Sequence, residues 1–297
     1  MGNARLAIGH NLNYFPVIVA YEKGFLRDEF GGALNIEIPY FANGPVQNEA
    51  FMAGRIDIVN AGDLPTIQLW ASGVDIQVIS YLWDAPAGHS LIANKRSGIT
   101  TVADLKGKKI TSEFGSSAYK LVLTILAARG LGASDAELIH LKRPEALIAL
   151  KQGAVDAAAT DEPFISEALR DDNIAEITTS RDYGGVYCVA FVRTAYAREN
   201  PHIVSRYLKV IKKANDWIVH NTAEATRIVM QFMGSGDFEG TKKYLTDRIW
   251  PVGADQGLID RLNDTIKFCR EQKLIAHYDL DAQNLVNDSY VKEAGVL

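Results

Sequence analysis

The chain has 297 residues, of which 47% are hydrophobic and 23% are charged, and its formal net charge is −5. This length suits about two domains, and the composition is typical of a globular protein. The chain has no basic run, so we expect no nucleic-acid partner. It also has no apolar run of transmembrane length.

The N-terminus leaves two interpretations of the compartment open. A strand is predicted directly after Met1-Gly2-Asn3, with no signal peptide before it. The protein is then cytoplasmic, or a secretory leader has been removed and Met1-Gly2 stems from cloning. The two cysteines, Cys188 and Cys269, lie far apart in apolar patterns. We expect buried free thiols, which indicate no particular redox compartment.

Strands and helices alternate through residues 4–192. Apolar runs predict strands at 4–9, 34–41, 56–61, 76–83, 89–95, 109–112, 137–141, 155–160, 175–178 and 187–192. Helical spacing, with Pro or Gly near the ends, predicts helices at 15–26, 46–53, 64–72, 101–105, 144–152 and 164–170, and one that starts at the Gly115-Ser116-Ser117 turn and runs to 129. Four further helices are predicted at 201–220, 223–233, 238–249 and 256–273. The alternation predicts an α/β fold of mostly parallel sheets, onto which the last four helices pack.

The turn Gly115-Ser116-Ser117 stands between an apolar strand and a long amphipathic helix. Ser116 or Ser117 can cap that helix, whose first N–H groups and positive dipole end point outward. The turn is therefore either a plain helix cap or one wall of a small anion-binding site.

Ligands of open α/β sheets bind beyond the carboxyl ends of the strands. We therefore expect the ligand-binding residues among the polar, small and aromatic side chains there: His10, Asn11, Asn13, Tyr14, Gly44, Gly62, Asp63, Trp83, Asp84, Ser116, Ser117, Asp161 and Glu162. Plainer roles stay open for them. The histidine and the asparagines can form turns, the aspartates can cap helices, and the tryptophan can belong to the core.

Motifs of catalysis and cofactor binding do not occur at these positions. The sequence contains no G-x-S-x-G, P-loop, G-x-G-x-x-G or H-E-x-x-H motif, and no two histidines stand four residues apart. The adjacent acidic pairs at 161–162 and 171–172 do not converge on one metal. We predict no catalytic residue, no cofactor and no metal, because polar groups in a cleft without catalytic chemistry are typical of a binding protein.

Several segments resemble the aliphatic sulfonate, taurine, nitrate and thiamine-precursor branch of periplasmic solute-binding proteins. The longest is 115–164, which starts with Gly-Ser-Ser, continues through a GL…D step and EA..AL..G.VDA, and ends in an acidic-Pro-aromatic step. YEKGFL at 21–26, AGRIDI at 53–58 and VADLKGK at 102–108 resemble further family segments. Together these segments are specific for the branch but not for one ligand.

The resemblance implies a two-lobed fold of the type II periplasmic-binding-protein class, each lobe a mostly parallel sheet flanked by helices. The first lobe would comprise 1–92 and 193–297 and the second 93–192, joined by two hinge crossings. A small-molecule ligand would bind between the lobes and close them, and an ABC permease would receive the closed form. The family expectation is a monomer, periplasmic or extracellular and lipid-anchored, whose membrane contact is the permease or a removed anchor.

The resemblance also assigns oxyanion-binding positions to Gly62, Ser116 and Ser117. The sequence departs from sulfonate binders at 160–164, where TDEPF replaces an aromatic step. Four strand-end carboxylates (Asp63, Asp84, Asp161 and Glu162) have no arginine or lysine among the strand-end residues considered, which favours a ligand with a cation or a hydrogen-bond donor.

We therefore expect a sulfonate, a taurine-like zwitterion or an amine-bearing or heterocyclic compound, and a simple anion such as sulfate or nitrate fits less well. Two alternatives stay open for the function. The first is an enzyme on the same fold, of the menaquinone pathway or desulfinase-like. The second is a ligand-sensing domain without transport.

Overall fold

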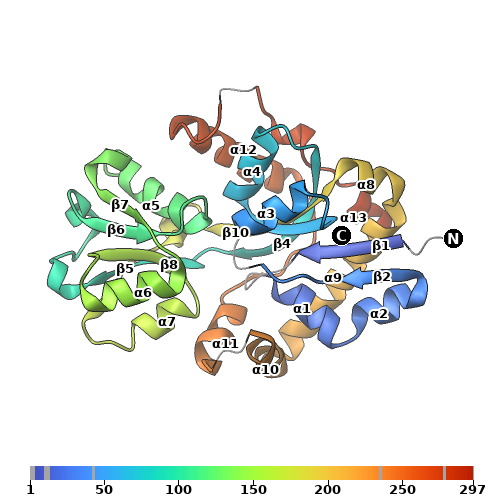
Figure 1. Ribbon diagram of the computed structural model, residues 1–297, viewed down its shortest axis with the longest axis horizontal. Helices are drawn as coiled ribbons and strands as arrows, with labels where there is room; N and C mark the ends of the chain where they lie inside the picture. The colour runs from blue at the N-terminus through green and yellow to red at the C-terminus, as the bar shows by residue number, and fades with distance from the viewer. Residues whose placement is uncertain (1–3, 10–13, 42–43, 234–235, 277–278, 297) are drawn as a thin grey trace. The chain divides into compact units, whose positions relative to one another are not determined.

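The protein is described from a computed structural model, in residues 4–9, 14–41, 44–233, 236–276 and 279–296 (Figure 1). The chain forms two compact units. Unit 1 contains 1–84, 187–236 and 249–297, and unit 2 contains 85–186 and 237–248. None of the described helices combines the length and the apolar character needed to cross a membrane.

Unit 1 is built on a five-stranded sheet of order β2-β1-β3-β10-β4. Its strands are β1 (Ala4–Gly9), β2 (Leu34–Glu37), β3 (Ile58–Gly62), β4 (Ile76–Ala85) and β10 (Val186–Arg193). β1 pairs in parallel with both β2 and β3, whereas β10 runs antiparallel to β3. The α/β class is confirmed, and the strand directions in this sheet are mixed.

Unit 1 contains nine helices in its described residues. They are α1 (Phe15–Glu22), α2 (Phe25–Phe30), α3 (Gly44–Met52), α4 (Asp63–Ala71), α8 (Thr194–Glu199), α9 (Pro201–His220), α10 (Thr222–Met233), α12 (Gln256–Glu271) and α13 (Ser289–Ala294), with single 3-10 turns at Gly31–Ala33 and Ala282–Asn284. The helix predicted at 15–26 is divided, because Gly24 adopts a left-handed backbone with φ of 74° and ends the first part. The short helices α8 and α13 were not predicted.

Unit 2 is built on a second five-stranded sheet, of order β7-β6-β8-β5-β9. Its strands are β5 (His89–Asn94), β6 (Lys109–Ser112), β7 (Glu137–His140), β8 (Ala157–Asp161) and β9 (Ile174–Thr179). β6 is parallel to β7 and β8, and β5 runs antiparallel to β8 and β9. The carboxyl ends of the three parallel strands and the start of β5 therefore meet at one edge, where His89 lies opposite Asp161.

Helices cover both faces of the unit 2 sheet, α5 on one face and α6 and α7 on the other (Figure 1). The helices of this unit are α5 (Ser117–Ala127), α6 (Arg143–Gln152), α7 (Phe164–Ala168) and α11 (Phe238–Thr246), with 3-10 turns at Lys95–Ser97, Val102–Leu105, Ala133–Asp135 and Ser180–Tyr183. Ala157 and Ala159 of β8 face the α5 core, and Ala158 faces the α6 core. Their small side chains let helices approach the strand from both sides, which explains the alanine run.

The compact units differ from the lobes expected from the sequence at β5 and at α11. The expected boundary at 92/93 lies inside β5, which pairs with β8 and β9 and belongs wholly to unit 2. α11, expected in the first lobe, lies in unit 2. It is held there by ion pairs of Asp237 with Arg170 at 2.6 Å and of Lys243 with Glu162 at 3.1 Å.

Candidate functional site

The residues that follow β6 and β8 lie at the carboxyl edge of the unit 2 sheet. Glu113 directly follows β6, and Asp161 is the last residue of β8. Because these two strands are parallel neighbours, their ends place the two carboxylates at the same edge. Both side chains are buried, with exposed fractions of 6% for Glu113 and 4% for Asp161.

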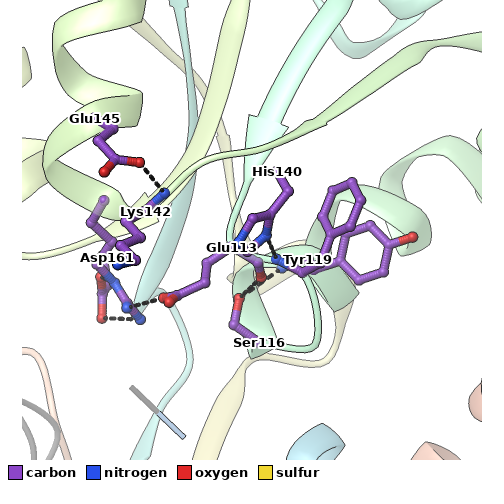
Figure 2. Close-up of polar contacts among 9 residues, drawn as sticks. Glu113, Ser116, Tyr119, His140, Lys142, Glu145 and Asp161 are labelled. Atoms are coloured by element: carbon purple, nitrogen blue, oxygen red, sulfur yellow. Dashed lines mark hydrogen bonds and ion pairs between the residues drawn. The ribbon is translucent and has the colours of Figure 1, made fainter. Parts of the chain in front are cut away.

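Arg143, the first residue of α6, joins these two carboxylates, which are labelled in Figure 2. Its Nη1 donates to Glu113 Oε2 at 2.6 Å and its Nε donates to Asp161 Oδ1 at 2.6 Å. Nη2 lies 3.5 Å from Asp161 Oδ2, which completes a two-point contact with this carboxylate. A guanidinium carries five N–H donors, so among the described residues two of them, one on each Nη atom, have no acceptor. We call these three residues the Arg143 cluster.

Positive groups control the ionisation of Asp161. Burial alone would raise the pKa of this carboxyl group, but the charges of Arg143, His89 and Arg248 and the hydrogen bond from Arg143 outweigh it. The pKa of Asp161 therefore lies below its usual value, and the carboxylate is ionised at neutral pH. Desolvation of the Arg143 guanidinium would lower its pKa, but the negative charges of Asp161 and Glu113 outweigh this effect and raise it.

We predict that Asp161→Asn makes the melting temperature less dependent on pH in the acidic range. A carboxyl group whose pKa is lowered by folding stabilises the protein above its unfolded pKa, about 4 for aspartate, and this stabilisation is lost as the pH falls through the folded value. An asparagine side chain cannot ionise, so the variant should melt lower at pH 7 and lose less melting temperature on acidification. Calorimetry from about pH 7 to pH 3 measures this difference. Parallel curves for the two proteins would contradict it.

The segment between β6 and α5 forms the rest of this edge. Ser116 is the N-cap of α5: its Oγ accepts from Tyr119 N at 3.3 Å and donates to the Glu113 carbonyl oxygen at 2.5 Å. Ser117 is the first helical residue. The cap role foreseen for Ser116 is thus present, and the start of an eleven-residue helix lies beside the Arg143 cluster (Figure 2).

Glu162 belongs to a separate pair of contacts. Its Oε2 accepts from Ser166 N at 2.9 Å, inside the first turns of α7, and its Oε1 accepts from Lys243 Nζ at 3.1 Å. Lys243 also contacts Asp247 at 2.8 Å. Glu162 therefore connects α7 with α11, and its charge already has a cationic partner within unit 2.

In unit 1, α12 supplies partners to both predicted aspartates. Arg261 donates to Asp84 through Nη1 at 2.8 Å and Nη2 at 3.2 Å, and Thr265 Oγ1 donates to Asp63 Oδ2 at 2.9 Å. Arg261 and Thr265 stand one helical turn apart, so the two aspartates lie along one face of α12. The Arg261 guanidinium also stacks 4.1 Å from the ring centroid of Tyr187.

The remaining predicted residues lie in unit 1. Tyr14 and Trp83 are only 1% and 2% exposed, which agrees with a core role for the tryptophan. Gly62 is the N-cap of α4 and Asp63 its first residue, while Gly44 begins α3. His10, Asn11 and Asn13 lie outside the described residues.

The premise that the four strand-end carboxylates have no arginine or lysine near them is wrong for three of them, and each of the four has a partner within its own unit. Arg143, Lys243 and Arg261 pair with Asp161, Glu162 and Asp84. The fourth, Asp63, accepts from a threonine hydroxyl. A local signal for one of these cations exists in the sequence, since Arg143 follows the predicted strand 137–141. Arg261 has no such signal, because it lies in the middle of a helix 177 positions from its partner.

The described residues contain no group of three or more His, Cys, Asp or Glu side chains that could hold a metal ion. The carboxyl edge of the unit 2 sheet instead contains a helix start and an arginine with N–H groups that no described residue accepts from. Groups of this kind are suited to donating hydrogen bonds to an anionic or oxygen-rich ligand. They do not include a nucleophile with a base beside it.

Comparison with known proteins shows which protein family this chain resembles. The model of the NMT1-like family matches residues 2–234. A candidate aliphatic sulfonates-binding protein of Bacillus subtilis is 29% identical over 299 residues, covering 97% of this chain and 87% of that protein. The taurine-binding periplasmic protein of Escherichia coli is 23% identical, covering 97% of this chain and 92% of that protein.

A solved structure agrees with these relatives. The alkanesulfonate-binding protein SsuA of Xanthomonas axonopodis pv. citri, bound to MOPS, is 26% identical and superimposes with a TM-score of 0.86 over 96% of this chain and 98% of that one. The resemblance noticed in the sequence and the fold that it implied are thereby confirmed. The chain belongs to the NMT1-like family and has the fold of the periplasmic binding proteins.

Proposed function

We propose that this protein is the extracytoplasmic solute-binding component of an ABC uptake system, and that its ligand is a small sulfonate. The curated relatives that span nearly the whole chain support a solute-binding role, because their names describe sulfonate- and taurine-binding proteins. A periplasmic or lipid-anchored location and an ABC permease as partner go with that role. We propose that the protein is a monomer, which light scattering of the purified chain would test.

The observation that carries the ligand class is the Arg143 cluster beside the start of α5. Glu113 and Asp161 are neutralised in part by Arg143, and Arg248 adds positive charge near Asp161. The two remaining N–H donors of Arg143 and the first N–H groups of α5 suit the three oxygens of a sulfonate. An amine has no unpaired strand-end carboxylate to bind among the four considered, which removes the reason to prefer a cationic ligand.

We propose binding without catalysis. A desulfinase-like enzyme would need an accessible cysteine thiolate, whereas Cys188 is 3% exposed within β10 and Cys269 is 0% exposed within α12. Burial in apolar surroundings disfavours the thiolate that such chemistry requires. The described part of the sheet edges supports hydrogen bonding and charge pairing, which are sufficient for a binding protein.

Calorimetric titration with a ligand panel tests this proposal. The panel contains methanesulfonate, 1-butanesulfonate, benzenesulfonate, taurine, sulfate, nitrate, 1-butylamine and a pyrimidine amine. We expect heat of binding and a raised melting temperature with sulfonates, because a ligand that binds only the folded protein stabilises it by mass action. The matched pair 1-butanesulfonate and 1-butylamine separates head-group charge from tail length. Binding of the amine without binding of any sulfonate would overturn the proposal.

A further inference from the structure

Phe114 is a large apolar side chain exposed at the proposed ligand site. It stands between Glu113, which binds Arg143, and Gly115, which leads into the N-cap of α5. Glu113 is buried with 6% exposed, whereas Phe114 is 37% exposed. Exposing a phenylalanine ring to water is unfavourable, so a ring at this position indicates either a plain surface residue or a contact that is completed by a ligand.

The ring of Phe114 is held in place by neighbours from two elements. Its backbone N donates to His140 Nδ1 at 2.9 Å, which leaves Nε2 as the protonated nitrogen of a neutral imidazole. The Phe114 ring lies 4.6 Å from the Tyr119 ring at an interplanar angle of 33° and 5.3 Å from the His140 ring at 67°. His140 of β7 and Tyr119 of the first turn of α5 thus fix the orientation of the ring; Figure 2 labels these two neighbours.

This aromatic group and the Arg143 cluster share one chain segment. Glu113 and Phe114 are adjacent, so their Cα atoms are about 3.8 Å apart. The Phe114 ring also packs on Tyr119 in the first turn of α5, so an anion that accepts hydrogen bonds from the start of this helix has an aromatic ring on the same turn. Methanesulfonate and taurine have little or no apolar surface with which to cover that ring, whereas a ring-bearing sulfonate can stack on it.

We propose that Phe114 determines the specificity of the ligand tail and that the protein selects aromatic sulfonates over taurine and short alkanesulfonates. This inference rests on the proposed function, because it assumes that the sulfonate group is bound at the same edge. Phe114, Tyr119 and His140 form the tail subsite, and the Arg143 cluster with the start of α5 forms the head subsite. The aromatic ring contributes affinity, and the head subsite contributes the requirement for an anion.

Titrations with benzenesulfonate and methanesulfonate test the inference on the wild type and on Phe114→Ala. We expect the wild type to bind benzenesulfonate at least about tenfold more tightly than methanesulfonate, and the variant to lose about tenfold for benzenesulfonate only. Phe114→Leu keeps an apolar side chain without an aromatic face, so its affinity for benzenesulfonate should lie between those of the wild type and Phe114→Ala. Ile148→Ala is the matched control, because Ile148 is 56% exposed on α6 of the same unit and should leave both affinities unchanged.

The outcomes separate this inference from the proposed function. Equal losses for both sulfonates in Phe114→Ala, or no loss for either, would overturn the tail subsite while the solute-binding role stands. Failure of the wild type to bind any sulfonate would overturn both. An unchanged melting temperature of the unliganded variants excludes misfolding as the cause of a loss, and Phe114→Leu provides the second test if Phe114→Ala is unstable.

Discussion

Replacing Arg143 with methionine should lower the stability of unit 2 by about 3 kcal/mol, because removing one partner of a buried ion pair leaves the other charge without compensation. Methionine keeps much of the aliphatic volume but removes the cation that binds both Glu113 and Asp161, which are 6% and 4% exposed. For a unit of this size, such a loss corresponds to a decrease in melting temperature of about 10 °C. Scanning calorimetry at neutral pH measures it.

The pH dependence identifies the cause of this loss. Two buried like charges raise each other's pKa, so in Arg143→Met the destabilisation should shrink as the solution is acidified and the carboxylates take up protons. The triple variant Glu113→Gln, Arg143→Met, Asp161→Asn removes all three charges and should recover much of the stability. Lys151→Met is the control, because Lys151 and Glu167 are 3.7 Å apart and more than a third exposed, and such pairs contribute less than about 1 kcal/mol. A loss of stability that is independent of pH and equal to that of the control would contradict the stabilising role assigned to the Arg143 cluster.

The order of strands and helices could be predicted from the sequence because the local signals agree with the tertiary structure. The alanine run of β8 is apolar on both sides, as a strand covered by helices on both faces requires. Gly24 shows where this reasoning stopped short. The apolar spacing continues across it, but its left-handed backbone divides the segment into α1 and α2. The spacing reports which side of the chain is buried and does not report the backbone dihedral angle.

Of the candidate site, only the residues at the ends of strands could be predicted from the sequence. Ser116, Ser117 and Asp161 follow strands whose positions are visible in the sequence, and the structure brings them to one edge of unit 2. The cations that pair with the acidic residues of the site could not be predicted in the same way. The cation that faces Asp161 follows a neighbouring strand, and the one that faces Asp84 comes from a helix far along the chain. Net charge at a site depends on such long-range packing, so the acidic residues at the strand ends do not by themselves give the charge balance of the site.

Ser117→Asp should reduce the affinity for 1-butanesulfonate by at least about a hundredfold while leaving the fold intact, since juxtaposed like charges cost several kcal/mol in a partly desolvated site. Ser117 is the first residue of α5, and a carboxylate in the first turn of a helix is favourable for the helix itself. The melting temperature of the unliganded variant should therefore stay the same or rise slightly. Calorimetric titration and thermal unfolding of the same samples measure the two effects.

Two further variants establish that the loss comes from charge at this position. Ser117→Asn has nearly the shape of the aspartate variant without its charge and should lose only a few-fold in affinity. Thr222→Asp adds the same charge to the first residue of α10 in unit 1 and should leave the affinity unchanged. Equal losses for the aspartate and asparagine variants would indicate a steric effect and not repulsion of an anion.

The result for Ser117→Asp decides between the two roles that the Gly115-Ser116-Ser117 turn can have. Capping of α5 is accounted for by Ser116, whose hydroxyl accepts from Tyr119 N and donates to the Glu113 carbonyl group. If capping were the only role of the turn, a carboxylate at Ser117 would be harmless to ligand binding and slightly favourable to stability. A large loss of affinity at unchanged stability has no explanation in capping, and it would locate the sulfonate group beside the Arg143 cluster.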